Sequence, residues 1–123
     1  MGYKRYDIGK VRLPPPLMEV GVEYKTDEYW LTKPVYRKII QIDELPEGTT
    51  TQVSIDADDI EFAFVDIANS WVGYLSNPGT NYATDSSAVL ALYVSDGSVF
   101  IFPAIPLDNV TAIVTVKYTK TTD

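Results

Sequence analysis

Short stretches in which apolar and polar residues alternate recur along this chain, and turn-forming residues separate them. The clearest stretch, "VTAIVTVKYTK", places Ala112, Val114, Val116 and Tyr118 on one face of an extended segment. A period of two residues is typical of a half-buried β-strand. Helical periodicity appears nowhere at length, so the pattern predicts an all-β protein.

A second strand is predicted after Pro34, in "VYRKIIQI". Proline cannot donate to a central ladder, so Pro34 marks the beginning of the strand. Pro46 and Gly48 in "DELPEGTT" end it. Arg37 and Lys38 are neighbours and therefore point to opposite faces. They do not converge on one basic surface for nucleic acid.

The next two strands are predicted in "TTQVSID" and "DADDIEFAFVDIA". In the second of these, both faces are apolar, which indicates a strand that is covered on both sides. In a domain of this size another subunit is a ready source of the second cover. One face is expected to carry Ile60, Phe62 and Phe64, and the other Ala63, Val65 and Ile67.

A hairpin is predicted in "AVLALYVSDGSVFIFP", where two apolar runs flank Asp96-Gly97. Asp-Gly favours the type I′ turn of two-residue hairpins. The sequence thus predicts five or six short strands in total. We therefore expect a small antiparallel β-sandwich or barrel-like domain over residues 23–123, preceded by an extended Pro-rich arm over residues 1–22.

The predicted arm differs from the body in charge and in stiffness. Pro14, Pro15 and Pro16 favour an extended polyproline II segment. Residues 1–12 have a net charge of +3, and the remaining residues a net charge of −10. This asymmetry either arises by chance in a short segment or marks an arm that docks on an acidic partner. The residues that would serve such docking are Lys4, Arg5, Lys10, Arg12, Pro14, Pro15 and Pro16.

Composition excludes several classes of function. The chain of 123 residues contains no Cys and no His, so cysteine nucleophiles, Ser-His-Asp triads and thiolate or imidazole metal ligands cannot be built. The net charge of −7 repels nucleic acid, and no apolar run is long enough to span a bilayer. The acidic turn "DADDIE" does not match an EF-hand, and a solvated turn is the simpler interpretation. We predict no catalytic residue, no metal and no cofactor.

The longest loop, "NSWVGYLSNPGTNYATDSS", combines aromatic rings with amides. Such a combination is typical of carbohydrate-binding loops, because rings stack on sugar faces and amides bind hydroxyls. Anchoring of the loop or contact with a second subunit is the alternative interpretation. The candidate glycan-binding residues are Trp71, Tyr74, Asn77, Asn81 and Tyr82.

Two blocks of the chain resemble a known family. "KTDEYWLTKPVYRKII", followed by "LPEGTT", and the final "VTVKYTKTTD" are similar to a small β domain that is common in bacteriophage structural proteins. That domain often stands at the C-terminal end of tail-fibre and other virion surface proteins. The family usually has Asp-Gly between its Trp and its Lys-Pro, whereas this chain has Leu31-Thr32.

The resemblance implies a virion structural protein without catalytic residues, made in the bacterial host cytoplasm and located on the virion surface as a homotrimer. A short arm without a fibre shaft suits a head fibre, a capsid decoration protein or a spike, with the arm anchored to capsid or tail and baseplate proteins. The alternative is a tail-fibre-type module that recognises host surface glycans.

Overall fold

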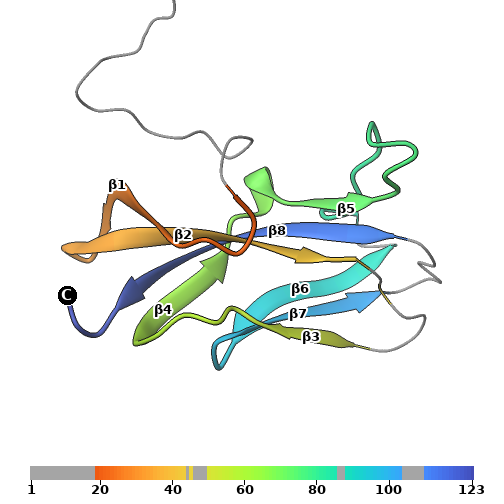
Figure 1. Ribbon diagram of the computed structural model, residues 1–123. Helices are drawn as coiled ribbons and strands as arrows, with labels where there is room; N and C mark the ends of the chain where they lie inside the picture. The colour runs from red at the N-terminus through yellow and green to blue at the C-terminus, as the bar shows by residue number, and fades with distance from the viewer. Residues whose placement is uncertain (1–18, 44, 46–49, 86–87, 104–109) are drawn as a thin grey trace, which may run out of the picture.

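The computed structural model describes residues 19–43, 45, 50–85, 88–103 and 110–123. In this part of the chain, eight strands form two sheets that pack against each other, and every strand pairing is antiparallel (Figure 1). This confirms the predicted all-β antiparallel fold. Residues 1–18 of the predicted arm lie outside the described residues, so the arm and its boundary with the body stay predictions.

The larger sheet is built around strand β8 (Thr111–Lys120), which pairs with β2 (Lys33–Ile42) along one edge. Strand β4 (Ile60–Val65) pairs with the last part of β8, and strand β5 (Trp71–Gly73) with its first part. Both lie on the edge that β2 leaves open, and a 3-10 helix (Ile67–Asn69) connects them. Strand β1 (Tyr24–Trp30) forms the outer edge next to β2.

The smaller sheet has the order β3 (Thr51–Ser54), β7 (Ser98–Pro103) and β6 (Val89–Ser95). Strands β6 and β7 form the predicted hairpin, with Asp96 at φ 50° and Gly97 at φ 76°. Positive φ at both central residues is the geometry of a type I′ turn. The prediction from Asp-Gly is therefore confirmed.

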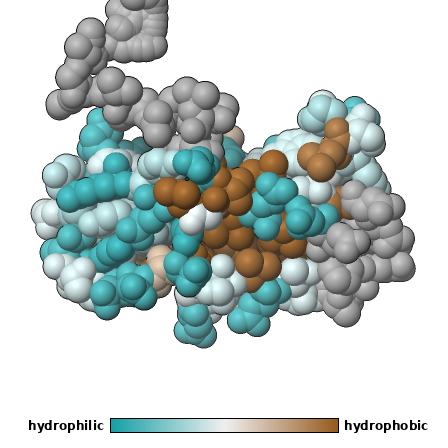
Figure 2. Space-filling model, in the orientation of Figure 1, coloured by the Kyte–Doolittle hydropathy of each residue, from teal (hydrophilic) through white to brown (hydrophobic). Residues whose placement is uncertain are grey.

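The core lies between the sheets, and β8 supplies its centre. The predicted face of β8, Ala112, Val114, Val116 and Tyr118, is wholly inaccessible to solvent. Figure 2 shows hydrophobic residues in the middle of one face of the molecule and hydrophilic residues over the end at which the β1–β2 hairpin lies. The other fully buried hydrophobic members of the core among the described residues are Leu45, Ile55, Val72, Val99, Ile101 and Val110.

The predicted faces of β4 are wrong in two respects: Ile60 lies on the inner face, and Ile67, expected on the same face as Ala63 and Val65, begins the 3-10 helix after the strand. The register between β4 and β8 shifts between Ile60 and Ala63, which is a β-bulge or similar irregularity. The extra residue turns Ile60 inward, where it packs on the core together with Ala63 and Val65. Phe62 and Phe64 stay on the opposite face and are 46% and 40% exposed.

Two strands were not predicted from the sequence. Strand β1 was missed because its polar and charged residues do not alternate with apolar ones. Strand β5 falls within the predicted loop and has three residues, which is too short for a period to be recognised. Both strands are edge additions to a sheet whose centre the pattern predicted correctly.

Candidate functional site

The two blocks that carry the family resemblance lie side by side in the structure. The first block spans β1 and most of β2, and β2 pairs with β8, which contains most of the second block, so that Tyr36 lies opposite Tyr118. Tyr36 donates a hydrogen bond of 2.8 Å from its hydroxyl to Oδ2 of Asp123, 87 positions later in the sequence. Nζ of Lys33 lies 3.3 Å from the carbonyl oxygen of Lys120. The blocks therefore form one structural unit.

A carboxylate from outside both blocks completes this unit. Glu23, just before β1, accepts a hydrogen bond of 2.5 Å from the hydroxyl of Tyr118 and one of 2.8 Å from Nζ of Lys120. The ammonium of Lys120 lies 4.6 Å from the ring centroid of Tyr36, a cation–π distance. We call Glu23, Tyr36, Tyr118, Lys120 and Asp123 the terminal network.

The terminal network shifts the pKa values of its own groups. Burial raises the pKa of Glu23, but the hydrogen bonds from Lys120 and Tyr118 and the charge of Lys120 outweigh it, so the pKa is lowered overall. Burial, the hydrogen bond to Glu23 and the charge of Glu23 all raise the pKa of Tyr118. Tyr118 therefore stays protonated as a hydrogen-bond donor. These hydrogen bonds connect the C-terminal residues and the chain before β1 to the end of the sheet.

Arg37 and Lys38 lie on opposite faces of β2, as predicted. Lys38 is 6% exposed and points between the sheets, where its Nζ donates a hydrogen bond of 2.7 Å to the carbonyl oxygen of Asp56. Arg37 lies opposite Lys117 on the outer face of the larger sheet. The two basic groups thus lie in different environments and form no shared basic patch.

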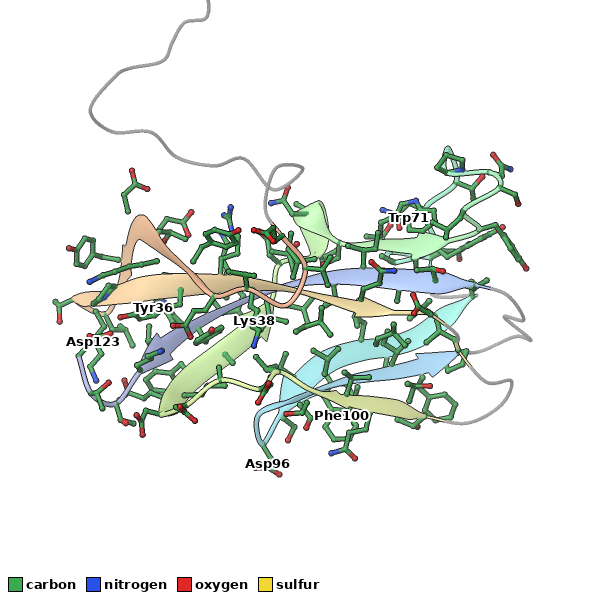
Figure 3. All side chains as sticks on the ribbon, in the orientation of Figure 1. Tyr36, Lys38, Trp71, Asp96, Phe100 and Asp123 are labelled. Atoms are coloured by element: carbon green, nitrogen blue, oxygen red, sulfur yellow. The ribbon has the colours of Figure 1, made fainter. Side chains whose placement is uncertain are left out.

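The predicted glycan-binding residues are distributed over β5 and the chain that follows it. Trp71 is half-buried, and its Nε1 donates a hydrogen bond of 3.2 Å to the carbonyl oxygen of Pro78. Tyr74 and Tyr82 meet edge to face at 6.3 Å and pack against the core. Asn77 is exposed. Trp71 lies at the opposite end of the larger sheet from Tyr36 and Asp123 (Figure 3).

Asn81 has a structural use that the sequence did not reveal. Its Oδ1 accepts hydrogen bonds from the backbone N–H groups of Val72 (3.1 Å) and Ala83 (2.9 Å), and its Nδ2 donates to the carbonyl oxygen of Ser70 (3.1 Å). The amide thereby fastens the returning chain to β5. Of the five predicted residues, Asn77 and Asn81 are exposed, and Trp71, Tyr74 and Tyr82 are half-buried.

Close approach of the backbone holds the same loop in place. A Cβ on Gly73 would lie 2.6 Å from the carbonyl oxygen of Thr80 and 2.6 Å from the ring of Trp71. Only glycine allows the returning chain and the indole ring to approach β5 this closely. The loop is therefore a packed part of the domain, and its exposed tip is the short segment 75–79.

A cluster of exposed aromatic residues that the sequence did not single out as a site lies on the outer face of the larger sheet. The ring of Trp30, at the end of β1, meets Phe62 and Phe64 of β4 edge to face at centroid distances of 5.4 and 5.3 Å. These side chains are 39%, 46% and 40% exposed in that order. We call these three residues the outer aromatic cluster. The sequence indicated this cluster only through the prediction that both faces of the strand at residues 60–67 are apolar.

Ion pairs flank the outer aromatic cluster. Lys33, opposite Trp30, binds Glu61 at 2.7 Å, and Lys117, opposite Phe64, binds Glu28 at 3.1 Å and Asp66 at 3.4 Å. Burial raises the pKa of Asp66, but its hydrogen bond with Asn69 and the charges of Lys117 and Arg37 outweigh it, so the pKa is lowered overall. Asp66 therefore remains charged at neutral pH and paired with Lys117.

A pocket lies on a different part of the domain from the residues predicted as sites. This shallow pocket of about 430 Å³ lies between β4 and the β6–β7 turn, and none of the residues predicted as sites lines it. No group of three or more acidic residues in the described ranges is arranged to hold a metal ion. Within those ranges, no helix has the length and apolar character needed to cross a membrane. The pocket is lined by Ala57, Ile60, Glu61, Ala63, Val94, Ser95, Asp96 and Gly97.

Comparison of the chain with protein-family models, with curated proteins and with solved structures finds no match.

Proposed function

We propose that this chain is a structural protein of a bacteriophage virion, a short head fibre, capsid decoration protein or spike that forms a homotrimer on the particle surface. In this proposal the β domain faces solvent. The arm, residues 1–22, anchors it to capsid or tail and baseplate proteins. The chain carries no catalytic residue and binds no cofactor.

The observation that supports the proposal most strongly is the contact between the two blocks that resemble the phage family. Tyr36 and Lys33 of the first block contact Asp123 and Lys120 of the second through side chains, far apart in the sequence. Because these residues stabilise one another, a substitution in one block weakens the packing of the other. Two blocks that depend on each other in the fold support the family resemblance more strongly than two short motifs that merely occur in the same sequence.

The distribution of charge supports the anchoring part of the proposal. The first twelve residues have a net charge of +3, and the rest of the chain a net charge of −10. A basic arm is attracted to acidic protein surfaces, whereas the acidic body is repelled by them and stays in solvent.

Mass spectrometry of purified particles of the virus that encodes the chain tests the proposal. We expect the chain in a fixed copy number per particle, and its absence from purified particles would overturn the proposal. Anchoring is tested by deleting residues 1–18 and measuring binding to particles that lack the protein. The deletion stops before Val20 and Gly21, because these residues contact Ile39 of β2 through a backbone bridge and a hydrogen bond of 2.8 Å. Retained particle binding would contradict an anchoring arm.

A second candidate function, recognition of host surface glycans, is supported by the exposed segment 75–79 beside the ring of Trp71. Asn77→Ala is the suitable variant for a glycan array, because Asn77 is exposed and its side chain does not fasten the loop as that of Asn81 does. Loss of binding in a folded Asn77→Ala variant would favour this function. Absence of binding by the unmodified protein would remove it.

A further inference from the structure

We infer that copies of this chain associate through the outer aromatic cluster of Trp30, Phe62 and Phe64, so that the occupant of this surface is a second copy of the same chain. The inference deepens the proposed function and rests on it, because a trimeric virion protein needs a surface on which its copies meet. The sequence pattern pointed to the apolar faces of β4 as a place for a second subunit, and the structure adds that Trp30 of β1 joins Phe62 and Phe64 there.

The first argument is the exposure of apolar area at one place. Trp30, Phe62 and Phe64 come from opposite edges of the sheet, β1 and β4, and still contact one another on its outer face. Aromatic side chains gathered on a surface are typical of the centre of protein interfaces, where they supply most of the binding energy. The outer aromatic cluster itself has no amide side chain to bind sugar hydroxyls, which favours a protein surface over a sugar.

The second argument is charge. The chain as a whole has a net charge of −7, so two copies repel each other through most of their surfaces. Around the cluster, Lys33, Arg37 and Lys117 balance Glu28, Glu61 and Asp66. Two copies can meet here without net repulsion, because a lysine of an ion pair on one copy is complementary to a carboxylate of an ion pair on the other copy. A strongly basic or acidic partner would gain nothing from this surface.

The third argument is strain in the turn next to the cluster. Leu31 and Thr32 connect β1 and β2 with φ of 52° and 66°, in the left-handed region that disfavours side chains, and a β-branched one most of all. Leu31 is 66% exposed. An exposed apolar side chain on a strained stretch of backbone does not stabilise the single copy. Contact with another copy would bury it.

The edge of the sheet argues against association by strand addition. Strand β1 is the outer edge, but its register with β2 shifts between Lys25 and Tyr29. Such an irregularity and the acidic residues within it disfavour pairing with another strand. The contact between copies is therefore expected to involve side chains of the outer face.

Trp30 can report on this contact directly. The chain has two tryptophans, so Trp71→Phe leaves Trp30 as the only indole. We expect the emission of Trp30 to shift to shorter wavelength, and its quenching by acrylamide to fall, as protein concentration rises. Native mass spectrometry of the unmodified chain should show multiple copies over the same range. Association without any change at Trp30 would overturn the inference.

A matched pair of variants locates the contact. Phe62→Ser should weaken self-association by at least about tenfold, as expected for an aromatic residue at an interface centre. Tyr93→Ser is the control, because Tyr93 is 47% exposed and stacks on Phe100 in the other sheet. It should leave self-association unchanged. Phe64→Ser replaces Phe62→Ser if circular dichroism shows that the latter is unfolded.

The outcomes separate this inference from the proposed function. Equal weakening by Phe62→Ser and Tyr93→Ser would overturn the outer aromatic cluster as the contact, even if the chain is found in virions. A single-copy species at high concentration would also overturn the inference. If such a single-copy protein still bound particles, and Phe62→Ser abolished that binding, the occupant of the outer aromatic cluster would be another virion protein. Absence from purified particles would overturn the proposed function, whereas concentration-dependent burial of Trp30 would still support the contact between copies.

Discussion

Tyr36 and Tyr118 lie directly opposite each other on β2 and β8, with ring centroids 6.0 Å apart and ring planes at 18°, yet their hydroxyls bind different carboxylates. Tyr118 is fully buried and donates to Glu23, whereas Tyr36 donates to the exposed Asp123. The pair thus connects the C-terminal residues and the start of β1 to the centre of the larger sheet. We therefore expect the hydroxyls of these two neighbouring tyrosines to contribute unequally to the free energy of unfolding.

We expect Tyr118→Phe to lower the free energy of unfolding by about 2 kcal/mol, because it removes a partly buried hydrogen bond from a fully buried tyrosine to a charged carboxylate. Tyr36→Phe is the control and should cost less than about 1 kcal/mol, since its hydrogen bond to Asp123 is exposed to solvent. Urea unfolding followed by circular dichroism measures both variants. Equal losses in the two would show that burial of the Tyr118 hydroxyl has no special effect.

Stability should decrease in acid. The pKa values of Glu23 and Asp66 are lowered in the folded state, so each carboxylate stabilises the fold at pH values above its unfolded pKa. That stabilisation is lost as the pH falls below the unfolded pKa values and through the lower, folded ones. Asp66→Asn should therefore unfold with a smaller pH dependence in this range. The measurement is the urea midpoint at a series of pH values, and an unchanged slope in the variant would contradict the role given to Asp66.

The β1–β2 turn should be improved by residues that accept positive φ. Leu31→Asn combined with Thr32→Gly should raise the free energy of unfolding by about 1 kcal/mol, because the type I′ turn then carries the residues it prefers. The corresponding control is Gly97→Ala in the β6–β7 turn, which should lower stability by about 1 kcal/mol at φ 76°.

The same double variant separates folding from association. If Leu31 serves contact between copies, the variant should be more stable at high dilution and yet associate more weakly than the unmodified chain. Thermal unfolding of the dilute protein and native mass spectrometry measure the two properties. A variant that is less stable at dilution would show that the Leu31-Thr32 turn is not strained.

Asn81→Ala should lower stability by about 2 kcal/mol, because it leaves the backbone N–H groups of Val72 and Ala83 without their shared acceptor. Asn77→Ala, at the exposed tip of the same loop, should change stability by less than about 0.5 kcal/mol. Thermal unfolding of the two variants measures the difference. If both variants behave alike, the amide of Asn81 does not hold the loop on β5.

The sequence by itself determined the parts of this protein that depend on neighbouring residues. The inward face of β8, the beginning of β2 near Pro34 and the Asp96-Gly97 turn were all predicted correctly. Alternation of side chains and the φ preference of a turn are local properties of the backbone, so they can be recognised without knowing the fold.

The tertiary structure alone decided where these strands meet. The irregularity near Ile60, the short strand β5 beside β8 and the contact between Tyr36 and Asp123 all depend on register. The same is true of the outer aromatic cluster, whose members come from the beginning and the middle of the chain. Register is set by hydrogen bonds and packing between distant segments, and a single extra residue in one strand moves a side chain to the other face. For this reason a periodic pattern predicts that a strand has two faces but does not specify what each face will contact.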